Sequence, residues 1–100
     1  MHAVAAVTAA LTITVWPQGP DGPAKTHVLR CPGSPSCARL ARVSEPFAPL
    51  AKGVACTEIY GGPQTALVRG TYMGGRVWAR FRRSDGCQIN RWNRISFLLH

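Results

Sequence analysis

The chain has 100 residues, of which 46% are apolar, and its 12 basic and 4 acidic side chains give a net charge of +8. This length fits one domain with a modest core, which we expect to span residues 1–100. No stretch is apolar for long enough to cross a membrane, so we expect no membrane partner. The positive charge favours acidic partners and also keeps a secreted protein soluble.

Four cysteines, an even number in a small chain, indicate two disulfides and an oxidising compartment, so we expect a secreted protein. They are Cys31, Cys37, Cys56 and Cys87. Three pairings exist, and the residues alone do not choose among them. The chain has no Cys-x-x-Cys pair. Because the usual spacing of zinc ligands is missing, a structural zinc site is only a weak alternative. We expect no metal and no cofactor.

The first third of the chain predicts two strands and a short helix. Residues 11–16 alternate apolar and polar side chains, as a half-buried strand does. A loop rich in Gly and Pro at residues 18–25 leads to a second strand at residues 26–31. A short helix follows, with Ser34 or Ser36 as its N-cap.

The second half contains the clearest pattern, a β-hairpin. Residues 64–72 and 76–83 alternate and are joined through a turn with two glycines. Further on, residues 90–94 suit a short turn of helix and residues 96–99 a closing strand. The pattern as a whole predicts an α+β fold, with a five-stranded antiparallel sheet, one main helix, a short second helix and two disulfides.

No feature of the sequence indicates an enzyme. The acidic residues are Asp21, Glu45, Glu58 and Asp85, and no two of them have the spacing of a catalytic pair. The chain has neither a Gly-x-Ser-x-Gly elbow nor a glycine-rich phosphate loop. A catalytic thiol is not expected either, because all four cysteines are expected to pair.

The segment with the most functional information is residues 56–63, Cys-Thr-Glu-Ile-Tyr-Gly-Gly-Pro. It has neither helical nor strand periodicity, begins at a cysteine and ends in a turn that cannot continue regular structure. A loop fixed at both ends suits a protease inhibitor, because rigidity lowers the ordering cost of binding. The alternative is a plain connector under a disulfide.

A second candidate surface lies on the predicted hairpin. Arg76, Trp78, Arg80 and Arg82 share one strand face. Together with Arg83, these arginines offer a cationic surface to an acidic partner. Single-strand nucleic-acid binders interleave aromatic and basic residues in the same way. Because the expected disulfides place the chain outside the cell, we do not expect nucleic acid as the partner. The third alternative is a homodimer through a sheet face.

Six stretches of the chain occur in an informative order. They are residues 11–15, 29–33, 56–63, 70–72, 75–77 and 85–90. With one cysteine opening the loop and another following the hairpin, this order resembles the Streptomyces subtilisin inhibitor family, small secreted actinobacterial inhibitors of serine proteases. The resemblance covers nearly the whole chain, from residue 11 onward.

The resemblance implies a homodimer formed through the sheet, and the disulfides Cys31–Cys37 and Cys56–Cys87. It places Glu58 at P1, the residue that fills the specificity pocket of a protease, and Ile59 at P1′. The scissile bond is then Glu58–Ile59. The reactive loop that contacts the protease would consist of Ala55, Cys56, Thr57, Glu58, Ile59, Tyr60 and Gly61.

The sequence also departs from the family pattern around the loop. Asp85 stands where the family has an asparagine that supports the loop by hydrogen bonding, and Thr57 stands where proline is common. P1 is commonly methionine, lysine or arginine, and here it is the acidic Glu58. The turn before Pro63 is one residue longer, and the ring between Cys31 and Cys37 is shorter. We therefore expect the partner to be a subtilisin-like or a glutamate-preferring serine protease.

Overall fold

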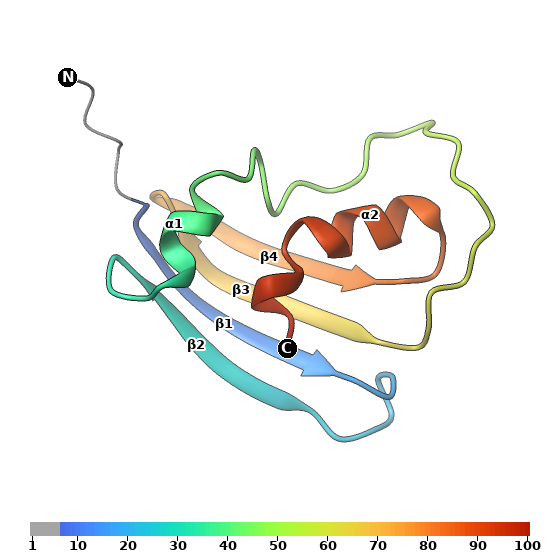
Figure 1. The fold of residues 1–100 in the computed structure, drawn as a ribbon, viewed down its shortest axis with the longest axis horizontal. Coiled ribbons are helices and arrows are strands. Elements are labelled where there is room, and N and C mark those ends of the chain that lie inside the picture. Colours follow the sequence, from blue (N-terminus) through green and yellow to red (C-terminus); the bar gives the residue numbers. More distant parts are fainter. Residues whose placement is uncertain (1–6) are drawn as a thin grey trace.

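An antiparallel sheet with helices on one of its faces forms the molecule (Figure 1). The computed structural model describes residues 7–100, and within them the sheet has four strands in the order β2-β1-β3-β4. The strands are β1 (Ala9–Trp16), β2 (Lys25–Cys31), β3 (Thr65–Tyr72) and β4 (Gly75–Arg82), and the helices are α1 (Ser36–Leu40) and α2 (Gly86–Arg94). The predicted α+β class is confirmed.

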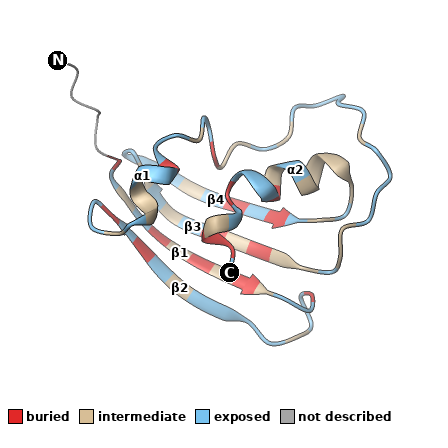
Figure 2. Cartoon of the chain, in the orientation of Figure 1, coloured by how far each residue is buried: buried red, intermediate tan, exposed pale blue. Residues whose placement is uncertain are grey.

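The alternation that predicted the strands also sets the two faces of the sheet. In β4, Ala79 and Phe81 are buried under the helices, whereas Trp78 and Arg80 are exposed on the opposite side. Buried and exposed residues therefore alternate along the strands (Figure 2). We call the side of the sheet opposite the helices the outer face. The buried core joins both layers and consists of Val7, Leu11, Ile13, Val15, Leu29, Cys31, Leu40, Ala66, Val68, Ala79, Phe81, Trp92, Ile95, Leu98 and Leu99.

The predicted closing strand at residues 96–99 is wrong, and with it the fifth strand of the sheet. The segment Ser96–Leu98 is a 3₁₀ helix. Its amides continue the helical pattern, because Leu98 donates to the Ile95 carbonyl at 2.8 Å and Leu99 to the Ser96 carbonyl at 3.0 Å. Ile95, Leu98 and Leu99 are all buried. Their spacing is that of one helix face, so the segment covers the sheet instead of extending it.

Helix α2 is longer than the predicted turn at residues 90–94, because its N-terminal end is capped. The Asp85 backbone is extended, and its Oδ1 accepts a hydrogen bond from the Gln88 amide at 2.9 Å. Such a cap satisfies one of the free amides at the start of a helix. Helix α2 buries Trp92 and lies against β4. This contact places the start of α2 beside the end of the hairpin.

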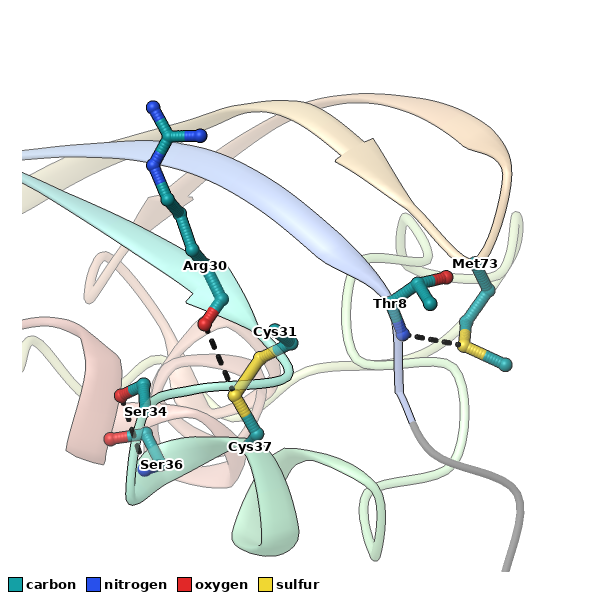
Figure 3. The surroundings of a disulfide bond; sticks show 7 residues. All are labelled: Thr8, Arg30, Cys31, Ser34, Ser36, Cys37 and Met73. Carbon is teal, nitrogen blue, oxygen red and sulfur yellow. Dashed lines mark hydrogen bonds between the residues drawn. A yellow bond between two sulfur atoms is a disulfide. The ribbon is translucent and has the colours of Figure 1, made fainter.

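The first disulfide closes the other end of the sheet. Cys31, the last residue of β2, is bonded to Cys37 in α1 (Figure 3). The pairing is the one that the family resemblance implies, and it is confirmed. It fixes the short helix α1 over the end of β2, where Leu40 enters the core.

Candidate functional site

The predicted reactive loop runs past the N-terminal end of α2 (Figure 1). Residues 54–62 contain neither helix nor strand. Cys56 is bonded to Cys87 in the first turn of α2, which confirms the second implied disulfide. The structure therefore brings the loop and residues 85–87 together, as the family resemblance implies.

One hydrogen bond fixes the loop immediately before Glu58. The Gly86 amide donates to the Thr57 carbonyl at 2.9 Å. A methyl group at Gly86 would overlap the Thr57 hydroxyl, so a larger residue at the start of α2 would force the Thr57 side chain to move. Together with the adjacent disulfide, this bond forms the first anchor of the loop.

A second anchor holds the loop after Tyr60. The Gly61 amide donates to the Arg83 carbonyl at 2.8 Å, and Arg83 Nε donates back to the Gly61 carbonyl at 3.1 Å. A Cβ at Gly61 would lie only 2.8 Å from Ile89 Cδ1 of α2, so the chain passes closer to the helix than a larger residue allows. Both polar backbone groups of Gly61 are thus satisfied by one residue.

Between the two anchors the chain forms an exposed arch of three residues, Glu58, Ile59 and Tyr60. The Ile59 side chain is 59% exposed and the Tyr60 side chain 70% exposed. Single exposed apolar side chains are common on proteins, but neighbouring ones are more frequent on surfaces that contact a partner. The Glu58–Ile59 peptide bond lies inside this arch.

Asp85 binds helix α2 through its side chain, whereas the family resemblance implies a hydrogen bond to the loop. Its side chain binds the Gln88 amide of α2, as described above, and so stabilises the helical turn that carries Gly86 and Cys87. The residue that the sequence did not reveal is Arg83, which binds the loop directly. The alternation of β4 could have indicated this position of Arg83. Alternate residues of a strand point to the same face, so Arg83 is expected on the side of the inward-facing Phe81 and not on that of Arg82.

The outer face is strongly basic. Its exposed arginines are Arg30, Arg69, Arg76, Arg80 and Arg82. Trp78, 64% exposed, lies among them and pairs with Arg69 across β3 and β4. The four acidic residues of the chain all lie outside the strands. Arg83, which the sequence analysis grouped with this surface, instead faces the loop and α2.

Cations also crowd the edge of the sheet beside α2. Burial lowers the pKa of the Arg91 guanidinium, and the nearby charge of Arg82 lowers that pKa further. Arg91 Nε donates to the Ala48 carbonyl at 3.0 Å, and its guanidinium lies 4.1 Å from the centre of the Phe81 ring. Carbonyl oxygens and an aromatic ring stabilise this cation in place of a carboxylate.

One group of side chains has the composition of a metal site but not its chemistry. Ligand atoms of Cys56, Asp85 and Cys87 lie within 4.8 Å of one another. Both sulfur atoms are consumed in the disulfide between Cys56 and Cys87. Since a thiolate is the sulfur ligand that binds metals, this group offers one carboxylate and no thiolate.

Comparisons of the chain with protein-family models, curated proteins and solved structures found no match. Within residues 7–100, no helix has the length and apolar character that a membrane span requires. The two disulfides are typical of an oxidising compartment.

Proposed function

We propose that this protein inhibits serine endopeptidases by presenting the Glu58–Ile59 peptide bond, hereafter the scissile bond, to the protease active site. The observation that supports the proposal is the exposed arch between the anchored residues Thr57 and Gly61. A segment that is already fixed loses little conformational freedom when a protease binds it. The arch therefore combines the accessibility of a substrate with the rigidity of an inhibitor.

The resemblance to the Streptomyces subtilisin inhibitor family supports the same proposal. The α+β class and both disulfides agree with what the resemblance implies. The sheet of the described residues has one strand fewer than the implied five. We propose membership in this family, and we propose secretion because the disulfides require an oxidising compartment.

A panel of serine proteases tests the proposal. It contains glutamate-preferring, subtilisin-like and trypsin-like enzymes, each titrated with the protein. We expect tight, slowly reversible inhibition of a glutamate-preferring or subtilisin-like enzyme, with cleavage confined to the scissile bond. Rapid cleavage at many bonds, or no effect on any enzyme, would contradict an inhibitory function.

The outer face supports a second candidate function, binding of an acidic partner without protease inhibition. The outer face carries five exposed arginines, and the strands carry no carboxylate, so the face is positively charged. Such a surface attracts anions at long range, and the attraction weakens as salt screens it. The arch plays no part in this function, so substitutions at Glu58 would leave it unchanged.

We also propose a homodimer through the outer face, where Trp78 and Val28 are large exposed apolar side chains in one cross-strand row. Two copies packed in this way bring their arginines close together. Higher salt screens that repulsion, so we expect the dimer to tighten as salt rises, whereas an acidic partner would bind more weakly.

Light scattering across micromolar concentrations at low and high salt measures this dependence. Trp78→Ser is expected to shift the protein to monomer. Ile59→Ser, which removes a similarly exposed apolar side chain away from the outer face, serves as the matched control and should leave the dimer intact. A monomer at every concentration and salt would defeat the proposed dimer.

A further inference from the structure

The two sides of the scissile bond are attached to the scaffold in different ways. On the amino side, Cys56 is bonded covalently to Cys87. On the carboxyl side, the first anchored residue within the described part of the chain is Gly61, which is held to Arg83 by hydrogen bonds alone. If the scissile bond breaks, the disulfide still retains the amino side, but the carboxyl side depends on Arg83.

Arg83 is itself held in a fixed position. Its Nη1 donates to Asn93 Oδ1 at 3.1 Å, while its Nε donates to the Gly61 carbonyl at 3.1 Å. The guanidinium carbon lies 5.8 Å from the centre of the Trp92 ring, and the residue is half-buried. A guanidinium carries several donors in one rigid plane, so a contact to α2 fixes the donor that reaches the loop.

The chemistry of a serine protease makes the carboxyl side decisive. On acylation, the serine oxygen bonds to the Glu58 carbonyl carbon and the peptide C–N bond breaks. The Ile59 nitrogen then leaves as an amine, carrying the proton that the serine hydroxyl gave to the base of the protease. Either this amine attacks the ester, re-forms the peptide bond and returns the proton to serine, or water attacks and releases the Glu58 carboxylate.

We propose that Arg83 is a positioning residue that keeps the new amino end at Ile59 beside the acyl group, so that the bond re-forms instead of being hydrolysed. This role rests on the proposed inhibitory function. Two residues separate the amine from its anchor, so while the bonds between Gly61 and Arg83 hold, the amine stays within about 7 Å of Gly61. A nucleophile held this close competes with water through its high effective concentration.

Replacement of the side chain tests the role directly. In Arg83→Ala the backbone carbonyl still accepts from the Gly61 amide, but the bond from Nε and the link to Asn93 are lost. With a protease that the wild type inhibits, we expect the ratio of cleaved to intact protein at equilibrium to rise about tenfold. Without the anchor, the cut end at Ile59 gains freedom that the intact loop does not, and its effective concentration beside the Glu58 carboxyl group falls. Resynthesis of the bond from purified cleaved protein should slow by a similar factor.

Two further variants distinguish a positioning role of Arg83 from an effect of its positive charge or of lost fold stability. Arg82→Ala removes an adjacent arginine that faces the other side of the sheet, and should leave the cleaved-to-intact ratio unchanged. Arg83→Lys keeps a cationic donor and should recover part of the lost resynthesis. A purely structural role would lower the unfolding midpoint of Arg83→Ala without moving the ratio, and that result would overturn the proposal.

Amide hydrogen exchange of the free protein gives a second readout that needs no protease. The Gly61 amide should exchange about tenfold faster in Arg83→Ala than in the wild type, whereas the Gly86 amide, bonded to Thr57, should not change. Unchanged exchange at Gly61 would overturn the role of Arg83. A wild type that inhibits no protease would overturn the proposed function and with it the resynthesis role. An inhibitory wild type with an unchanged ratio in Arg83→Ala would overturn only the role of Arg83.

Discussion

Glu58→Lys is expected to transfer inhibition from glutamate-accepting proteases to trypsin-like ones. A P1 side chain is largely desolvated in the specificity pocket, and a carboxylate without a cationic or hydrogen-bonding partner is strongly disfavoured there. A pocket with its own carboxylate repels Glu58 further but pairs with a lysine. We expect the inhibition constant for a trypsin-like enzyme to fall by about a thousandfold, which corresponds to about 4 kcal/mol.

The position of Glu58 makes this substitution informative. The side chain is exposed on the arch and is not part of the core, so we expect the stability of the fold to change by less than about 0.5 kcal/mol. Glu58→Met should favour subtilisin-like enzymes, because an apolar pocket accepts methionine without burying a charge. The change in inhibition therefore reports on the pocket and not on the scaffold.

Inhibition constants for the wild type and both variants against three protease types provide the measurement. Glu45→Lys makes the same charge change at another exposed position and serves as the control, which should inhibit like the wild type. If the wild type, Glu58→Lys and Glu58→Met inhibit each enzyme equally, Glu58 does not occupy the specificity pocket. The loop proposal would then fail.

Local patterns predicted most of the fold because they depend on neighbouring residues. The alternation in β4 placed Phe81 inward and Trp78 outward, and both placements are confirmed. The same reasoning failed at the C-terminus, where the apolar run of residues 97–99 was interpreted as a strand. The helical spacing of Ile95, Leu98 and Leu99 was present in the sequence, but a run this short fits both periods.

The support of the loop was harder to predict, because it depends on contacts between residues far apart in the chain. Arg83 and Gly61 are separated by 22 positions, and no local pattern links them. Asp85 has the sequence of a helix cap as much as that of a loop support, since Gln88 follows three residues later. The structure shows the cap, because the Asp85 carboxylate accepts from the Gln88 amide.

Removal of the disulfide between Cys56 and Cys87 by a double substitution to serine is expected to destabilise the fold and to abolish lasting inhibition. The bond closes a ring with a sequence separation of 31. In the chain-entropy model, a ring of this size contributes about 4 kcal/mol to the free energy of unfolding, a large share for a small domain. The amino-side anchor of the loop would be reduced to the hydrogen bond between Thr57 and Gly86.

The matched control is the double substitution to serine at Cys31 and Cys37, whose disulfide ties β2 to α1 at the end of the sheet opposite the start of α2 (Figure 1). Its sequence separation of 6 predicts a smaller loss of stability, about 2 kcal/mol. Because this disulfide does not touch the loop, we expect the control to keep its inhibition at temperatures where it remains folded.

Denaturant unfolding measures the two losses of stability, and the rate of cleavage at the scissile bond measures the effect on the loop. Without the disulfide between Cys56 and Cys87, the acyl side of a cleaved loop is held beside α2 only by the hydrogen bond between Thr57 and Gly86. The acyl group then moves away from the Ile59 amine more easily, and attack by water is favoured over re-formation of the bond. The variant should then be consumed as an ordinary substrate while it is still folded. Slow cleavage and full inhibition by the folded variant would show that the hydrogen bonds of Thr57 and Gly61 hold the arch without the covalent bond.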